Sequence, residues 1–240
     1  MRKSILGLSA VLLATVATPA LAQEIAGTGL TVSGNAALTS DYRFRGVSYS
    51  GGDIAIQGGF DVSHESGFYV GTWASSIDGG ATYGHTEVDV YGGWSGEVTP
   101  GLTFDAGLLY YVYPNGTGDS DYFEPYASVS GTLGPVEAEL GVAYAWDGQN
   151  ALGDQDNLYV YTDLSAGIPN TPITLNGHVG WTDGVLSFDP DGESFDWSVG
   201  ADYAITPNIS FGVSYVGVEA FPSIDGLTDD TAVATLSFSF

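Results

Sequence analysis

The feature that most constrains this chain is a period-two alternation of apolar and polar residues that recurs along most of its length. In residues 136–146, for example, Val136 and Leu140 fall on one face of an extended strand, and Glu137 and Glu139 fall on the other. Successive side chains of a β-strand point to opposite faces. The pattern therefore predicts strands that each have one apolar and one polar face.

Twelve such segments can be counted, most of them close to the length of about 9–11 residues that a tilted strand needs to cross a bilayer. They are residues 30–45, 54–64, 68–76, 86–96, 102–113, 122–133, 136–146, 157–168, 173–182, 194–205, 209–218 and 231–240. Five connections are short, namely 65–67, 97–101, 134–135, 169–172 and 206–208, and six are longer, namely 46–53, 77–85, 114–121, 147–156, 183–193 and 219–230. Short and long connections at opposite ends are typical of outer-membrane barrels, whose short turns are periplasmic. We therefore expect an all-β fold, a transmembrane antiparallel up-and-down β-barrel of about 12 strands.

Residues 1–22 predict a signal peptide. Two cations at positions 2 and 3 precede an apolar run over residues 5–17, and residues 20–22 form an A-x-A cleavage site. The alternative is an uncleaved membrane anchor, but the apolar run is shorter than the roughly 18 residues that a spanning helix needs. We expect residues 23–240 to form one exported barrel domain in the bacterial outer membrane, in contact with its lipid.

Charge and composition exclude several function classes. Beyond residue 22 the bases are Arg43 and Arg45 against 29 acidic residues, a formal charge of 2 − 29 = −27. A chain this acidic does not bind nucleic acid phosphates. The absence of cysteine excludes disulfides, thiolate metal sites and a thiol nucleophile. No cofactor is expected.

Aromatic residues gather near both ends of the apolar faces, as in the interfacial girdles of membrane barrels. A soluble sandwich would also alternate with period two, but its core has no reason to sort aromatic residues to strand ends. The set near the long loops is Tyr42, Phe44, Tyr110, Tyr144, Trp146, Trp181, Phe195, Trp197 and Tyr215, and the set near the short turns is Phe60, Trp94, Phe104, Tyr203, Phe211, Phe238 and Phe240.

Two stretches carry a family resemblance. The segments LTSDYRFRGVSYS (38–50) and AIQGGFDVSHESGFYVGTWAS (55–75) resemble the opening of the TorF-type porin family of proteobacterial outer-membrane proteins. The alternating C-terminus, which ends in Phe240, resembles the signal that outer-membrane barrels present to the barrel assembly machinery. The resemblance implies an outer-membrane channel and supplies no catalytic residues.

The polar faces predict an acidic lumen. Many carboxylates around a wet pore would favour cations over anions, so we expect a porin-like channel for passive diffusion of small solutes, and not an enzyme. The alternative is a plugged barrel that acts as an adhesin, a receptor or a structural outer-membrane protein through its acidic external loops. The candidate pore-lining residues are Asp41, Arg43, Arg45, Asp61, Glu87, Asp89, Asp105, Glu124, Glu137, Glu139, Asp163, Asp196 and Asp202.

The two arginines are predicted to lie at the outer end of the first strand, facing inward. In an extended strand Arg43 and Arg45 share a face with Asp41, and Arg43 would lie across from Gln57. One interpretation is that the pair anchors a network of wall carboxylates, because an unpaired buried charge is unfavourable. The other is that it sets a transverse field at the narrowing of the pore.

Whether the lumen is open depends on the balance of small and large inward residues. Gly107, Gly141, Ala143, Ala145 and Gly200 are predicted to leave room. Inward tyrosines would fill it or form a stacking track for sugars; these are Tyr91, Tyr111, Tyr113, Tyr126, Tyr159 and Tyr161.

Two other features of the sequence concern Ca²⁺ binding and catalysis. Asp189, Asp191 and Glu193 lie on a glycine-containing loop and supply the oxygen ligands that Ca²⁺ takes, although Asp and Gly are also common in solvated turns. Catalysis would need a base, and His178 lies on the polar face of a strand beside Asn176. A lone histidine there is more often a hydrogen-bonded filler of the lumen.

Overall fold

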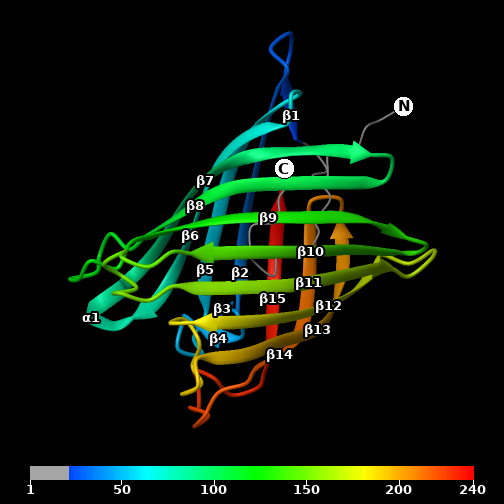
Figure 1. Ribbon diagram of the computed structural model, residues 1–240. Coiled ribbons are helices and arrows are strands. Elements are labelled where there is room, and N and C mark those ends of the chain that lie inside the picture. The colour runs from blue at the N-terminus through cyan, green and yellow to red at the C-terminus, as the bar shows by residue number, and fades with distance from the viewer. Residues whose placement is uncertain (1–21) are drawn as a thin grey trace.

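The computed structural model describes residues 22–240, in which twelve antiparallel strands close into a barrel (Figure 1). Each wall strand pairs with the next along the chain, and β2 closes the ring by pairing with both β5 and β15. The wall strands are β2 (Leu30–Thr39), β5 (Ala55–His64), β6 (Phe68–Gly79), β7 (Gly84–Thr99), β8 (Leu102–Val112), β9 (Tyr122–Leu133), β10 (Val136–Ala145), β11 (Asn157–Gly167), β12 (Ile173–Gly184), β13 (Glu193–Thr206), β14 (Ile209–Val218) and β15 (Thr231–Ser239). The predicted up-and-down barrel is confirmed. The predicted signal peptide lies, except for Ala22, outside the described residues.

Four smaller elements complete the chain. Strand β1 (Gln23–Ile25) pairs with β2, and a separate hairpin is formed by β3 (Arg43–Phe44) and β4 (Val47–Ser48). Helix α1 (Gly80–Tyr83) connects β6 and β7. Across residues 22–240 the structure contains no helix that is long and apolar enough to cross a membrane.

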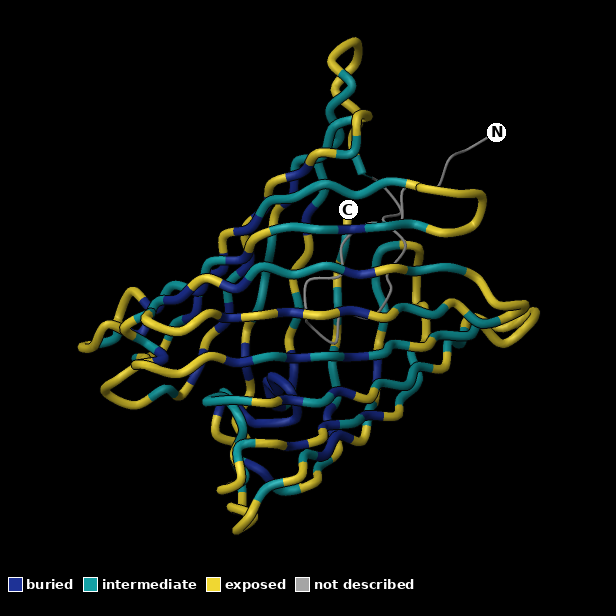
Figure 2. The backbone as a smooth tube through the Cα atoms, in the orientation of Figure 1, coloured by how far each residue is buried: buried dark blue, intermediate teal, exposed yellow. Residues whose placement is uncertain are grey.

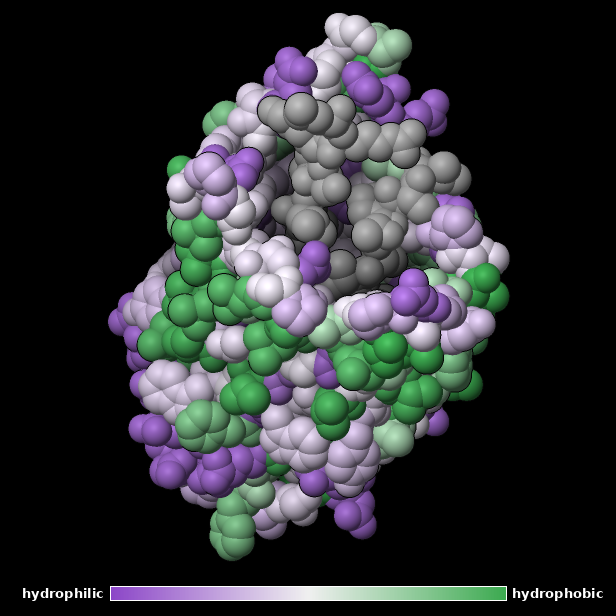
Figure 3. Space-filling view, turned by 90° about the vertical axis from the view of Figure 1, so that its right-hand side faces the viewer, coloured by the Kyte–Doolittle hydropathy of each residue, from purple (hydrophilic) through white to green (hydrophobic). Residues whose placement is uncertain are grey.

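The apolar faces of the strands point outward and remain exposed. Ile56 near the start of β5 is 69% exposed, and Val199 in the middle of β13 is 60% exposed. Figure 3 shows a band of hydrophobic residues across one face of the molecule, with hydrophilic residues beyond it. The sandwich alternative is wrong, because a sandwich would bury these faces against each other.

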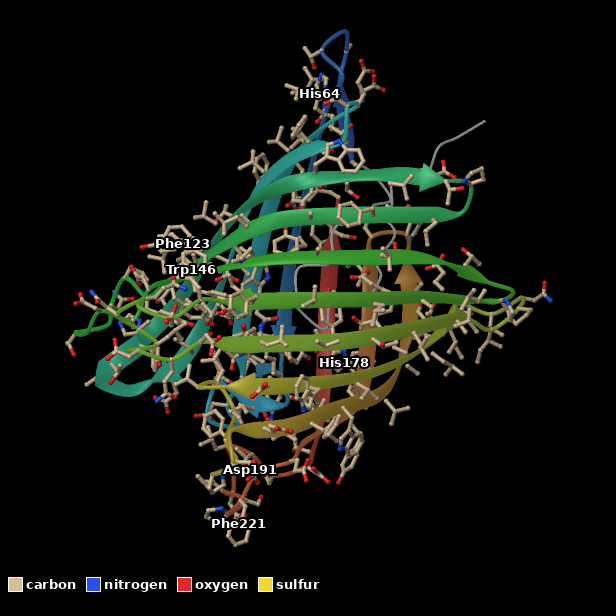
Figure 4. All side chains as sticks on the ribbon, viewed as in Figure 1. His64, Phe123, Trp146, His178, Asp191 and Phe221 are labelled. Carbon is tan, nitrogen blue, oxygen red and sulfur yellow. The ribbon has the colours of Figure 1, made fainter. Side chains whose placement is uncertain are left out.

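The two ends of the barrel differ in their connections. Figure 4 shows His64 at the end with short turns, here called the turn end, and Asp191 and Phe221 at the opposite or loop end. The prediction of a long loop at residues 77–85 is wrong. Strands β6 and β7 extend through most of it, and α1 makes the connection in four residues.

The outward aromatic residues largely follow the predicted girdles. Phe195 and Tyr215 are exposed near the loop end, and Phe60 and Tyr203 are exposed near the turn end. Tyr42 and Phe44 are exceptions: each is at most 5% exposed, and neither belongs to the outer face. The reason is that the chain leaves the barrel wall after Thr39.

The C-terminal residue belongs to the seam that closes the barrel. The backbone N–H of Phe240 donates to the carbonyl of Gly34, and the N–H of Gly34 donates back to Phe240, both at 3.0 Å. The Phe240 ring lies over Gly34, where a Cβ atom would approach the ring to 2.7 Å. Glycine at this position thus lets the terminal ring lie against the wall.

Candidate functional site

Residues 41–50 form a hairpin that folds into the barrel, and we call this segment the inner hairpin. All of its residues except Tyr49 are buried, and Figure 2 shows this buried stretch within the outline of the barrel. The prediction that Arg43 and Arg45 lie on the first wall strand is therefore wrong. That strand ends at Thr39, and the residue across from Gln57 is Ala37.

The tip of the inner hairpin is a two-residue loop. Arg45 has φ 49° and Gly46 has φ 79°, and positive φ at both central residues is what a type I′ hairpin loop requires. Phe44 and Val47 pair on either side of it. Glycine accepts this conformation readily, but arginine does not, so other contacts must hold Arg45 in place.

A hydrogen-bonded network around Asp41 shapes the base of the inner hairpin. The Asp41 carboxylate accepts bonds from the Ser48 hydroxyl at 2.6 Å, the Ser50 hydroxyl at 3.0 Å and Arg43 Nε at 2.5 Å. The backbone N–H of Tyr42 donates to the Ser50 hydroxyl at 2.9 Å. These short-range bonds pair the polar side chains at the base of the inner hairpin, so the segment can form a compact turn inside the barrel.

Arg45 joins the tip of the inner hairpin to the wall strands β9 and β11. Its Nη2 atom lies 2.8 Å from both carboxylate oxygens of Glu124 on β9, and its guanidinium lies 4.1 Å from the ring centroid of Tyr159 on β11. Glu124 is only 1% exposed, whereas Nε and Nη1 of Arg45 are buried without a partner among the described residues. The pair is thus a buried ion pair across the lumen, as in the anchor interpretation.

Arg43 instead joins the inner hairpin to the loop of residues 219–230. Its Nη1 atom donates to the carbonyls of Asp229 at 2.8 Å and Leu227 at 3.3 Å. The backbone N–H of Ser48 donates to Leu227 at 2.8 Å. The sequence does not predict this contact, because nothing local to either segment indicates that they meet.

We expect Arg45→Gln to destabilise the barrel by about 3–5 kcal/mol, because removal of one partner leaves the other buried charge uncompensated. The double variant Arg45→Gln with Glu124→Gln should recover much of that loss. The measurement is the urea midpoint of unfolding from lipid vesicles. Equal midpoints for the single and double variants would show that the pair does not anchor the hairpin.

Gly46→Ala provides a test of how closely the tip fits the wall. A Cβ atom at Gly46 would lie 2.7 Å from both the Gly217 carbonyl and Val218 Cβ, whereas one at Gly27, which has the same φ of 79°, would meet nothing within 4 Å. Alanine is disfavoured to a similar extent at both positions, because both have the same positive φ. Gly46→Ala should therefore be less stable than Gly27→Ala by about 1–3 kcal/mol. Matching urea midpoints for the two variants would contradict the close fit.

The wall carboxylates nearest the inner hairpin are deeply buried. Glu87 is 0% exposed and accepts bonds from the Tyr42 hydroxyl at 2.7 Å and the Tyr113 hydroxyl at 2.9 Å. Asp89 is 4% exposed, and its Oδ1 atom has no partner among the described residues. Glu124 accepts a further bond from the Tyr111 hydroxyl at 3.0 Å.

A second set of carboxylates is held by neutral donors. Three of the contacts are Tyr91 to Asp61 at 2.6 Å, Tyr69 to Asp105 at 2.8 Å and Tyr161 to Glu139 at 3.0 Å. The side-chain amide of Asn176 likewise donates to Asp202. A hydroxyl or amide donor fixes the position of a carboxylate without cancelling its charge. Glu137 has no hydroxyl or amide donor among these contacts. It is exposed on the inward face of β10.

His178 lies on β12 (Figure 4), and its ring contacts carboxylates of both neighbouring strands. Nδ1 is 2.7 Å from Asp163 on β11, and Nε2 is 2.9 Å from Asp196 on β13 and 2.9 Å from the Tyr159 hydroxyl. Both ring nitrogens are therefore engaged. Asp163 keeps 46% of its side chain exposed, so this cluster still presents a carboxylate to the lumen.

The lumen is filled on one side and lined by small residues on the other. Inward tyrosines of β6–β9 and β11 form what we call the aromatic wall; these are Tyr69, Tyr91, Tyr111, Tyr122, Tyr126, Tyr159 and Tyr161. The Tyr161 ring and the Tyr126 hydroxyl occupy the space above Gly141 and Gly107. The expectation that these two glycines leave the lumen open is therefore wrong, because neighbouring tyrosines cover them.

The opposite side, from β13 round to β2, carries Gly212, Ser214, Thr235 and Thr39, and we call it the small-residue wall. A cavity of ≈ 70 Å³ lies between this wall and the inner hairpin. Asp41, Arg43 and Asp202 also line it. The open space beside the inner hairpin is thus off the barrel axis.

Of the candidate Ca²⁺ ligands, Asp189 and Asp191 lie in the loop between β12 and β13, and Glu193 is the first residue of β13. Backbone N–H groups of Asp191 and Glu193 donate to the carboxylates two residues earlier, at 3.4 Å and 3.1 Å, as in ordinary turns. Asp189, Asp191 and Glu193 line a shallow depression with Glu219. Within residues 22–240, no group of three or more histidine, aspartate or glutamate residues is arranged to hold a metal ion.

The family of the chain follows from its sequence. Residues 23–240 match the model of the Gcw_chp family, described as a bacterial protein of unknown function. The chain belongs to the Gcw_chp family. A comparison with curated proteins finds no match, and the TorF-type resemblance is not confirmed beyond the Gcw_chp family and the porin-like fold.

Solved structures with the same fold are outer-membrane channels. The NanC porin is 13% identical, with a TM-score of 0.59 over 87% of this chain and 98% of that one. The KdgM porin is 7% identical, with a TM-score of 0.58 over 87% and 97%. A channel from Pseudomonas putida F1 is 11% identical, with a TM-score of 0.53 over 88% and 95%. At these identities the likeness establishes the fold of this chain, a closed porin-like barrel.

Proposed function

We propose that this Gcw_chp protein is an outer-membrane channel for passive diffusion of small solutes, and that it prefers cations. The observation that carries the proposal is the charge of the barrel interior. Eleven carboxylates from the wall and the inner hairpin face it, against Arg43, Arg45 and His178. They are Asp41, Asp61, Glu87, Asp89, Asp105, Glu124, Glu137, Glu139, Asp163, Asp196 and Asp202.

The way these carboxylates are held supports a lasting negative potential. Both arginines are committed to ion pairs with Asp41 and Glu124. Asp61, Asp105 and Glu139 are positioned by tyrosine hydroxyls, which carry no charge. Fixed negative charge in a narrow lumen between low-dielectric walls raises the local concentration of cations.

The same charge argues against anionic solutes. A structure of the KdgM porin is in complex with disordered oligogalacturonate, an anionic sugar chain. Such a ligand would meet Asp202 and Asp163 in this lumen with few cations to offset them. The aromatic wall is also packed against itself, so it offers little free ring surface for sugars to stack on.

The outer membrane is the location that fits the exposed apolar surface, and lipid is the partner that would cover it. The terminal Phe240 at the barrel seam is a proposed contact for the barrel assembly machinery. Stepwise current increases after addition of the purified protein to a planar bilayer are the expected result. A folded, inserted protein that never conducts would contradict the channel.

A second candidate function is favoured by the inner hairpin. Its burial, with Arg45 on the far wall and Arg43 on the loop of residues 219–230, is what a plugged barrel would show. Such a protein would act as an adhesin, receptor or structural protein through its acidic loops. The bilayer experiment separates the two, because a plugged barrel inserts without conducting.

A further inference from the structure

The inner hairpin divides the lumen into two unequal sides. On the side of the aromatic wall, the tip residues Phe44 and Arg45 pack against Tyr111 and Tyr159, each at most 8% exposed. The Phe44 and Tyr111 rings meet edge to face at 5.9 Å. This side is sealed by large, well-packed side chains.

The other side is built from residues that leave space. Gly212 and Ser214 on β14 and Thr235 on β15 face the cavity beside the inner hairpin. The hydroxyls of Ser214 and Thr235 suit a hydrated passage, and the Thr235 hydroxyl donates to the Thr39 hydroxyl at 2.9 Å. Asp202 projects into the same cavity from β13.

One side chain links this cavity to the loop of residues 219–230. Arg43 lines the cavity and donates to the carbonyls of Leu227 and Asp229 in the overlying loop. Its Nη2 atom also lies 3.6 Å from the Asp229 carboxylate, which is 38% exposed. These are contacts between two loops, and no wall strand needs to move for them to part.

We propose that solutes pass off the barrel axis, between the inner hairpin and the small-residue wall, and that Arg43 is the residue that gates and filters this route. The inference rests on the proposed channel function and assigns distinct roles to the two arginines. Arg45 holds the inner hairpin against the aromatic wall, while the Arg43 side chain lines the cavity through which solutes would pass. The charge of this route favours small cations over anions, because two carboxylates, Asp41 and Asp202, flank the single guanidinium.

Cysteine substitution tests the route, since the natural chain has no cysteine. Ser214→Cys places a thiol on the small-residue wall, and Ser128→Cys places one on β9, on the side of the aromatic wall. Each variant is treated in a planar bilayer with a cationic methanethiosulfonate. We expect several-fold lower single-channel current for Ser214→Cys and little change for Ser128→Cys. Block at Ser128→Cys without block at Ser214→Cys would overturn the route.

Arg43→Gln tests the gate. We expect this variant to raise the conductance or the open probability several-fold. Its urea midpoint of unfolding should be no lower than that of Arg45→Gln. An unchanged current in a folded Arg43→Gln barrel would refute its role. If the wild type does not conduct, the channel function fails separately. The rate of thiol labelling, read by mass spectrometry in vesicles, then still decides the route: faster labelling at Ser128→Cys than at Ser214→Cys would overturn it.

Discussion

Replacing residues 41–53 with Asn-Gly should raise the single-channel conductance several-fold. The new connection, Ser40-Asn-Gly-Ile54, is a four-residue loop next to the paired residues Thr39 and Ala55, a length that antiparallel strands accept. The physical reason is that the inner hairpin occupies the lumen and its removal leaves water in its place. Conductance in planar bilayers is the measurement.

The matched control is a shortening within residues 114–119 of the loop between β8 and β9, where no residue is buried. None of these residues belongs to the core cluster that contains Tyr42 and Phe44 of the inner hairpin, so the conductance should stay near that of the wild type. Circular dichroism and the gel shift of unheated samples establish that each barrel has folded. A folded barrel that conducts no better without its inner hairpin would show that the hairpin is not the obstruction.

Neutralising three carboxylates of the lumen should abolish much of the cation preference. The variant Asp61→Asn, Asp105→Asn and Glu139→Gln keeps an oxygen acceptor for the hydroxyls of the three tyrosines that contact these residues, so the wall should keep its shape. Removing three fixed charges from the wall of a narrow, low-dielectric lumen weakens the field that a permeating ion meets. The reversal potential under a KCl gradient should move toward zero.

A control with the same change in net charge is available outside the lumen. Asp189→Asn, Asp191→Asn and Glu193→Gln neutralise two carboxylates in the loop between β12 and β13 and a third at the first residue of β13. Charges separated from the passage by more than a Debye length of about 10 Å are largely screened in 0.1 M salt. Equal shifts for the two triple variants would mean that net charge, and not the lining of the lumen, sets selectivity.

The wall of the barrel could be predicted from the sequence because one physical preference decides it. Each wall strand exposes an apolar face outward and a polar face inward, so the alternation fixes both the strands and their facing. Asp61 and Asp105 were placed inward on this ground, and both do face inward. Their partners Tyr91 and Tyr69 were not predicted, because those contacts depend on the register between strands.

The inner hairpin was missed for a related reason. Ser40, Tyr42 and Phe44 continue the alternation of the first strand, so the pattern alone extends that strand to residue 45. The chain instead turns where Arg45 and Gly46 adopt positive φ. The contact that stabilises this turn is between Arg45 and Glu124, which is 79 residues away in the sequence. Arg-Gly is not a strong sequence signal for a type I′ loop, unlike Asn-Gly or Asp-Gly.

The central claim is that the lumen selects for cations, and the reversal potential of the wild-type channel tests it most directly. Under a roughly tenfold KCl gradient, ideal selectivity for one monovalent ion gives about 59 mV. We predict a potential with the sign of K⁺ selectivity and a substantial fraction of that size, carried by the carboxylates that face the lumen. A potential of the opposite sign, which would mean a preference for chloride, would contradict the account.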